Sequence, residues 1–257
     1  MSKNFETNSR AAGHILEIVL DRPDRGNSLS ATTFWELAEV LHTAETDDSI
    51  TALIVRGNHG TFCLGGDMSD PAGKRDPRYA DAIHHFTEQW LNRTIPAVAL
   101  VDGGAQAYGC ALALSSDLVY TTDRAWFALP ELHHGLVPAY ALAVLNATGN
   151  AAVGARLMWQ GERLSPDEVA RTVSRVIPCN TLQVAENTME ARIENWIGGG
   201  MDSLRRARRF INKTTTATTE SNLESAREEL QTTLHAVEDD AREAQSYLVT
   251  ENDFPEQ

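Results

Sequence analysis

Short runs rich in β-branched residues alternate with stretches of helical periodicity up to about residue 180 of this chain, and only helical patterns follow. Residues 14–20 (HILEIVL) and 51–56 (TALIVR) have the composition of strands. Between them, Ser30 is a plausible N-cap for a helix whose apolar face includes Phe34 and Leu37. This order predicts an α/β core followed by a C-terminal helical extension.

We place the core at residues 1–197 and the C-terminal helical region at residues 198–257. Residues 96–101 and 173–177 read as two more strands, and residues 69–78, which contain two prolines and a glycine, as a mobile loop. The further helices are expected at residues 79–91, 141–147, 151–159, from Ser165 onward, and at 182–197, 201–211 and 221–248.

Composition and charge narrow the possible partners. The 257 residues carry a formal net charge of −14, which argues against a nucleic-acid-binding surface. Cys63, Cys110 and Cys179 are odd in number and widely spaced, so we expect free thiols and neither a disulfide framework nor a zinc site. No apolar run approaches the roughly 18 residues that span a bilayer, and the N-terminus lacks a signal-peptide core. We expect a cytoplasmic protein without a membrane or nucleic-acid partner.

Residues 103–135 contain the features that point to chemistry. Small residues surround Tyr108 and Gly109 at the start of a helical pattern, and a helix beginning at such a turn directs free N–H groups toward negative charge. The stretch continues through an apolar run that reads as helix and then strand. It ends on PELHHG, where Glu131 follows the apolar strand 126–129 (WFAL). Gly65 and Gly66 mark a second place where backbone can approach a ligand. Each feature also has a purely structural interpretation, as a tight turn or a helix-start acid.

Several segments resemble, in order and with the same spacing, the motifs of the crotonase (enoyl-CoA hydratase/isomerase) superfamily. They are residues 21–30 (DRPDRGNSLS), 65–67 (GGD) and 96–103, and Gly109 with the Pro130-Glu131 pair. The resemblance covers nearly the whole chain. It implies a β-β-α spiral core, a C-terminal helical region that completes a homotrimer or a hexamer, and a CoA thioester as substrate with no permanently bound cofactor.

The same resemblance implies an oxyanion hole made by the main-chain N–H groups of Gly66 and Tyr108. Such donors stabilise the negative charge that develops on a thioester oxygen, and removing one typically costs about 10²- to 10³-fold in rate. Hydratases of this family use two glutamates. Here Ala111 occupies the first position and Glu131 the second. Simple hydration by paired carboxylates is therefore not expected.

A closer resemblance is to the carboxymethylproline synthases of carbapenem antibiotic biosynthesis, a crotonase branch. PELHHG is similar to the branch's PELKHG, residues 210–213 (FINK) to its AVNK, and His235 lies where the branch has a functional histidine. This implies a transferase-type reaction: malonyl-CoA is decarboxylated to a bound enolate, which attacks pyrroline-5-carboxylate, the cyclic form of glutamate semialdehyde. Hydrolysis of the thioester, with water activated by Glu131, then gives carboxymethylproline. Tyr79 and Ala111 differ from the branch's Trp and Gln.

The candidate catalytic residues are thus Glu131, Gly66, Tyr108 and His235. The candidate substrate-binding residues are Tyr79, Gly65, Gly109, Ala111, His133, Arg25, Leu64 and Lys213. For Arg25, Lys213 and the basic run 205–209 the alternatives are contact with CoA phosphates and a solvated surface. No metal site is indicated.

Two other functions stay open. One is a crotonase that acts as thioesterase, isomerase or decarboxylase on another acyl-CoA. The other is a non-catalytic crotonase-fold subunit that serves assembly.

Overall fold

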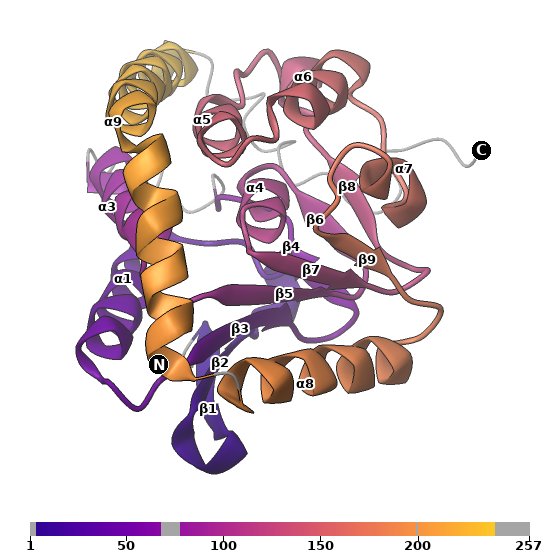
Figure 1. Ribbon diagram of the computed structural model, residues 1–257. Helices are drawn as coiled ribbons and strands as arrows, with labels where there is room; N and C mark the ends of the chain where they lie inside the picture. Colours follow the sequence, from indigo (N-terminus) through magenta and orange to yellow (C-terminus); the bar gives the residue numbers. More distant parts are fainter. Residues whose placement is uncertain (1–3, 68–77, 199, 240–257) are drawn as a thin grey trace.

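The computed structural model describes residues 4–67, 78–198 and 200–239 (Figure 1). Two sheets form its centre. The six-stranded sheet contains, in spatial order, β1 (Phe5–Arg10), β2 (Ile15–Leu20), β3 (Ala52–Gly57), β5 (Ala97–Val101), β7 (Leu118–Thr121) and β9 (Val176–Pro178). β1 and β2 are antiparallel, and the other neighbours are parallel. The parallel three-stranded sheet contains β4 (Thr61–Cys63), β6 (Gly104–Gln106) and β8 (Trp126–Ala128).

Consecutive strands alternate between the two sheets. β3 leads to β4, β5 to β6 and β7 to β8, so each strand of the larger sheet is followed by one of the smaller. Because β4, β6 and β8 are parallel neighbours, their carboxyl ends meet at one edge. Open parallel sheets bind ligands at such an edge. The chain therefore brings three loops together there, after residues 63, 106 and 128.

Helices cover both faces of the larger sheet. α8 packs against β5 and β7 on one face, where Ala185, Met189 and Ile193 share a buried cluster with residues of those strands. The alternate strand residues face the main core. The helices are α1 (Ala31–Thr46), α3 (Arg78–Asn92), α4 (Tyr108–Leu114), α5 (Ala139–Ala147), α6 (Ala151–Gln160), α7 (Pro166–Ala170), α8 (Leu182–Gly198) and α9 (Met201–Asp239), with 3₁₀ turns η1 (Ala11–Gly13), η2 (Pro23–Arg25) and η3 (Glu131–His134).

Local sequence explains where several helices begin. The Ser30 side chain accepts a hydrogen bond from the Thr33 N–H at 3.2 Å, which satisfies one of the first donors of α1. At α7 the Ser165 and Glu168 side chains form a reciprocal capping box, and Pro166 occupies the first helical position. Both N-caps were expected from the sequence and are confirmed.

Three arginines and an asparagine donate hydrogen bonds at the carboxyl ends of four helices. Arg205 donates to the carbonyls of residues 44, 47 and 50 around the end of α1, and Arg93 donates to that of residue 115 after α4. Arg175 reaches residue 148 after α5, and Asn212 reaches residues 92 and 93 after α3. Cations and donors are favourable there because the last carbonyls of a helix lack helical partners. The basic run 205–209 is therefore partly structural.

Three predicted elements have other bounds in the structure, and three strands were missed. The expected strand 173–177 begins only at Val176, because residues 171–175 form the turn that ends α7, with the Val173 N–H on the Val169 carbonyl. The expected helices 201–211 and 221–248 are joined as far as Asp239 in α9, and later residues lie outside the described part. β1 is largely polar and exposed, and β4 and β6 have three residues each, so none gave a strand pattern.

α9 shares the main hydrophobic core with the preceding elements. Its residues Leu223 and Ala226 belong to the same buried cluster as Phe34 of α1. The division at residues 197 and 198 stays a prediction. The expected loop at residues 69–78 lies, except for Arg78, outside the described residues. Within the part of the chain that is described, no helix has the length and apolar character needed to cross a membrane.

Candidate active site

A small cavity lies at the carboxyl ends of β4, β6 and β8, where the three loops meet. Its volume is about 70 Å³. The loops contribute Gly66, Tyr108 and Glu131 to its lining, and helices α3, α5 and α9 line the other side. The lining residues in the described chain are Gly66, Tyr79, Ile83, Ala107, Tyr108, Glu131, Leu136, Val137, Pro138, Ala139, Tyr140, Ala141 and Leu230.

The Gly65–Gly66 turn is held by a short parallel bridge to Leu29. The Leu29 N–H donates to the Gly65 carbonyl at 2.8 Å, and the Asp67 N–H donates to the Leu29 carbonyl at 2.9 Å. In this pattern the intervening residue, Gly66, directs its own N–H away from Leu29. Asp67 is fully buried and forms an ion pair with Arg22 at 2.7 Å. The DRPDRGN segment therefore fixes the position of the turn.

The second turn is formed by Ala107 and Tyr108. Ala107 has φ +53°, a conformation that an alanine adopts only under constraint from its surroundings. It lies directly against Gly65, because a Cβ added to Gly65 would be 2.6 Å from the Ala107 Cβ and 3.3 Å from the Tyr108 nitrogen. Within the described residues, neither the Gly66 N–H nor the Tyr108 N–H has a hydrogen-bond acceptor. Two unused main-chain donors thus line one cavity.

Gly109 is a packing requirement of the same turn. A Cβ at this position would be 2.1 Å from the Cys63 carbonyl oxygen, so only glycine lets α4 approach β4 this closely. Gly109 does not line the described cavity. Its effect on the site is to position the Tyr108 backbone.

Glu131 supplies the carboxylate of the cavity. It opens η3, its residue is 4 % exposed, and its Oε2 atom has no hydrogen-bond partner within the described residues. Burial raises the pKa of Glu131 to about 8, although contact with its own backbone N–H acts in the opposite direction. At neutral pH this carboxyl group is therefore mostly protonated and able to donate a proton.

Tyrosines form much of the wall. The Tyr79 hydroxyl lies against Gly66, since a Cβ added there would be 2.0 Å from it, and its ring meets Phe34 edge-on. Tyr79 is thus both a core residue and a cavity wall. The Tyr108 hydroxyl is bonded to Thr87 at 2.7 Å. Burial is the main cause that raises the pKa of both tyrosines, which therefore stay neutral.

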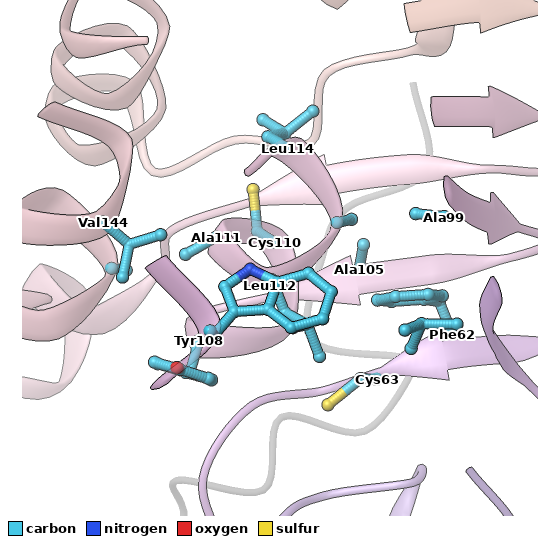
Figure 2. Close-up of a cluster of buried hydrophobic side chains, with 14 of the residues drawn as sticks. Phe62, Cys63, Ala99, Ala105, Tyr108, Cys110, Ala111, Leu112, Leu114 and Val144 are labelled. Atoms are coloured by element: carbon cyan, nitrogen blue, oxygen red, sulfur yellow. The ribbon is translucent and has the colours of Figure 1, made fainter. Parts of the chain in front are cut away.

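Other candidate residues lie away from the described cavity. Ala111 is completely buried beside Cys110, in the same cluster as Phe62 and Val144 (Figure 2). Leu64 packs against Gly26, and the exposed His133 packs against Gly161.

The remaining candidates are Arg25, Lys213 and His235. Arg25 is 38 % exposed on η2, and Lys213 is exposed on α9. His235 belongs to α9, and its side chain lies outside the described part, so its role stays a prediction.

Sequence reasoning missed the helical side of the cavity. Ile83, Tyr140 and Leu230 line it from α3, α5 and α9. Each looks like an ordinary apolar or aromatic position on a helix, and only the packing of three distant segments brings them together. The single available signal was Tyr140, a large side chain within a run of alanines.

The cysteines beside the turns are unsuited to nucleophilic chemistry. Burial raises the pKa of the Cys63 thiol to about 12 and also raises that of Cys110. Cys63 instead accepts a hydrogen bond from the Gly65 N–H at 3.4 Å. Among the residues described, no cluster of His, Cys, Asp or Glu could hold a metal ion.

A larger cavity of about 470 Å³ lies at the opposite ends of α3, α4 and α5. It contains Asp117, Arg175 and Arg208, and Arg93 is close by. Arg93 and Arg208 both form ion pairs with Asp117, and Arg93 and Arg175 also donate to helix-terminal carbonyls. These charges thus have structural partners, and the smaller cavity is the better candidate for chemistry.

Comparison with known proteins identifies the family of this chain. The family model described as enoyl-CoA hydratase/isomerase matches residues 10–256. The chain belongs to the enoyl-CoA hydratase/isomerase family. Carnitinyl-CoA dehydratase of Proteus mirabilis is 32% identical over 204 residues, which cover 76% of this chain and 76% of that protein. The 2,3-dehydroadipyl-CoA hydratase of Escherichia coli is 30% identical over 179 residues, covering 66% and 69%.

The rat enoyl-CoA hydratase domain-containing protein 3 is 29% identical over 184 residues, which cover 69% of this chain and 61% of that protein. The matched region thus spans less than two thirds of the rat relative and also of its mouse counterpart. Both are named as mitochondrial, and a cytoplasmic location for this family member stays a prediction.

Solved structures of the family show the same fold. The enoyl-CoA hydratase of Mycobacterium avium subsp. paratuberculosis has a TM-score of 0.82 at 22% identity, covering 95% of this chain and 99% of that one. The enoyl-CoA hydratase of Bacillus halodurans has a TM-score of 0.81 at 19% identity, covering 96% and 99%. The expected crotonase-type α/β fold with a C-terminal helical region is confirmed.

Proposed function

We propose that this family member acts on an acyl-CoA thioester by forming a bound enolate. The thioester carbonyl oxygen accepts hydrogen bonds from the Gly66 and Tyr108 N–H groups, and Glu131 transfers a proton to or from a carbon atom of the acyl group. The observation that carries this proposal is the presence of two unused main-chain donors and one buried, unpaired carboxyl group in one cavity. Fixed donors of this kind stabilise charge on the thioester oxygen.

Relatives named as acting on CoA thioesters support the substrate class. The two-carboxylate hydration of the family's hydratases is not favoured, because Glu131 is the one carboxylate among the described lining residues and Ala111 is buried in the core. A single acid–base group suffices for proton transfer at a carbon atom. When ionised Glu131 removes a proton from the carbon next to the thioester, the electron pair of the broken C–H bond moves onto the thioester oxygen. Return of the proton from Glu131 to carbon restores the carbonyl.

Hydrogen exchange tests this proposal. Butyryl-CoA is incubated with the protein in D₂O, and deuterium at the carbon next to the thioester is measured by mass spectrometry. We expect catalysed exchange that falls by about 10²-fold or more in Glu131→Gln, while the Kd for butyryl-CoA changes little. Exchange at the uncatalysed rate in the native protein, or equal exchange in the Glu131→Gln variant, would contradict the proposal.

We also propose a specific form of this chemistry, the carboxymethylproline synthase reaction. Loss of CO₂ from malonyl-CoA leaves the enolate of acetyl-CoA. Its carbon atom attacks the imine carbon of pyrroline-5-carboxylate, and the ring nitrogen takes up a proton. Hydrolysis of the product thioester then needs ionised Glu131 to activate water, whereas protonated Glu131 quenches the enolate to acetyl-CoA. The observation that favours this form is that Glu131 has no second carboxylate beside it in the described cavity.

Product analysis separates the two outcomes. The protein is incubated with malonyl-CoA and pyrroline-5-carboxylate, and products are identified by mass spectrometry. Carboxymethylproline supports the synthase reaction, and its yield should rise above pH 8 as Glu131 ionises. Acetyl-CoA without an adduct identifies a decarboxylase and contradicts the synthase.

Assembly as a homotrimer or a hexamer is also a proposal. It is supported by large apolar side chains on the surface, among them Trp159 at 75% and Phe210 at 69% exposure. Sedimentation analysis measures the mass directly.

A further inference from the structure

The cavity has a loop end and a helical end. Gly66, Tyr108 and Glu131 come from the loops after β4, β6 and β8. The helical end is where α3, α5 and α9 pack together (Figure 1). In the proposed function the acyl group extends from the two N–H groups into the helical end, because the apolar part of the described lining lies there. The residues that line the helical end are Tyr79, Ile83, Tyr140, Ala141 and Leu230.

Tyr140 is the largest side chain that α5 contributes to this end, and it is held in place. It is 4% exposed, and its hydroxyl forms a hydrogen bond with His84 Nδ1 of α3 at 3.1 Å. The two rings meet edge-on with centroids 6.3 Å apart. An ion pair between Arg227 and Asp81 fastens α9 to α3 nearby. The ring therefore cannot swing away without breaking contacts to a second helix.

The free volume sets a length limit. A cavity of about 70 Å³ holds about five water-sized groups, at roughly 10–15 Å³ for each. Its walls at the helical end are aromatic or aliphatic, apart from the tyrosine hydroxyls. An aliphatic chain of about four to six carbons fills this volume, and a longer chain must displace a wall side chain, of which Tyr140 is bonded to a second helix.

We propose that Tyr140, buttressed by His84, is the specificity-determining residue of this site and restricts its substrates to short acyl groups. This inference rests on the proposed function, and it adds the class of acyl-CoA that the cavity accepts.

The test is the affinity of the protein for saturated acyl-CoAs from acetyl to decanoyl, measured by calorimetry. Each additional CH₂ that is buried raises affinity about fourfold. For the native protein we expect this rise to stop at about four to six carbons. In Tyr140→Ala the rise should continue by several carbons, because the ring no longer closes the cavity. Tyr140→Phe keeps the ring and should retain the native limit.

Two further variants make the test decisive. Tyr140→Leu is a milder truncation that should lengthen the limit in part, and it serves if Tyr140→Ala does not fold. Val184→Ala, at a side chain of α8 that is 48% exposed and outside the cavity lining, should leave the limit unchanged.

The inference is overturned if native affinity rises steadily through decanoyl-CoA, or if the Tyr140 truncations keep the native limit. If no acyl-CoA binds the native protein, the proposed function itself fails. A native protein that binds acyl-CoAs, but whose chain-length limit does not change in the Tyr140 variants, would contradict only this inference.

Discussion

Glu131 and Gly66 line the same cavity, and each is constrained by its surroundings in a different way. Glu131 is a buried carboxyl group whose Oε2 atom has no hydrogen-bond partner among the described residues. Gly66 is a backbone position with no room for a side chain. Each can be tested by a substitution with a defined direction.

Glu131→Gln should stabilise the protein in a pH-dependent way. The folded pKa of Glu131 is about 8 against an ordinary value of 4.5, so between these values the native state holds a proton that the unfolded chain releases. Native stability should therefore fall as pH rises from 4.5 to 8, by up to about 1.4 kcal/mol per pH unit. The uncharged glutamine variant lacks this loss.

Urea unfolding of both proteins at pH 4.5, 6 and 8 measures the effect. The stability advantage of Glu131→Gln should grow with pH across this window. An advantage that is constant or shrinks would mean that Glu131 ionises normally in the folded protein.

Gly66→Ala should destabilise the protein because its Cβ would overlap one atom, the Tyr79 hydroxyl oxygen. Its Cβ would be 2.0 Å from the buried Tyr79 hydroxyl but 3.3 Å from the next ring atom. We expect a cost of about 1–3 kcal/mol, as for other overpacked sites, and recovery of at least about 1 kcal/mol when Tyr79→Phe is added.

Gly65→Ala is the matched control. Its φ of +102° strains any side chain, and its Cβ would meet Ala107, not Tyr79. Tyr79→Phe should therefore not rescue it. Equal rescue of both alanine variants, measured by urea unfolding, would show that Tyr79 does not act through contact with Gly66.

Helix α9 extends from the carboxyl end of α1 to the cavity. Near its start Arg205 reaches the carbonyls at the end of α1, and further along Leu230 lines the cavity. Between them Leu223 and Ala226 are buried in the core. Residues 214–219 of α9 are rich in threonine, which costs under about 0.7 kcal/mol of helix propensity per residue. The packed residues before and after this stretch offset that cost, so it stays helical.

Arg205→Ala should destabilise the protein by about 1–3 kcal/mol, because it removes a buried charged donor from the carbonyls of residues 44, 47 and 50. Arg206→Ala, at the exposed neighbouring position, should change stability by less than about 0.5 kcal/mol. Thermal and urea unfolding of the two variants measure this. Equal effects would exclude the capping role of Arg205.

Across the chain, sequence patterns predicted the features that depend on local chemistry. Ser30 and Ser165 were recognisable as N-caps, and the Gly65–Gly66 turn and Glu131 were expected in one site, where the structure brings them together. β4 and β6 could not be predicted because a three-residue strand carries no periodicity.

The helical end of the cavity escaped prediction for a different reason. Ile83, Tyr140 and Leu230 are far apart in sequence, and no local pattern places them together. They form one wall only because α3, α5 and α9 pack together. A property that arises from tertiary packing has no local sequence signal.

The central claim is that the Gly66 and Tyr108 N–H groups bind and polarise a thioester carbonyl. The most direct measurement is the vibrational spectrum of bound butyryl-CoA labelled with carbon-13 at the carbonyl, taken as a difference against the unlabelled ligand. Two fixed donors should move the carbonyl stretch to lower frequency than in water, and Glu131→Gln should keep that shift. A bound carbonyl that absorbs at its solution frequency would contradict the claim.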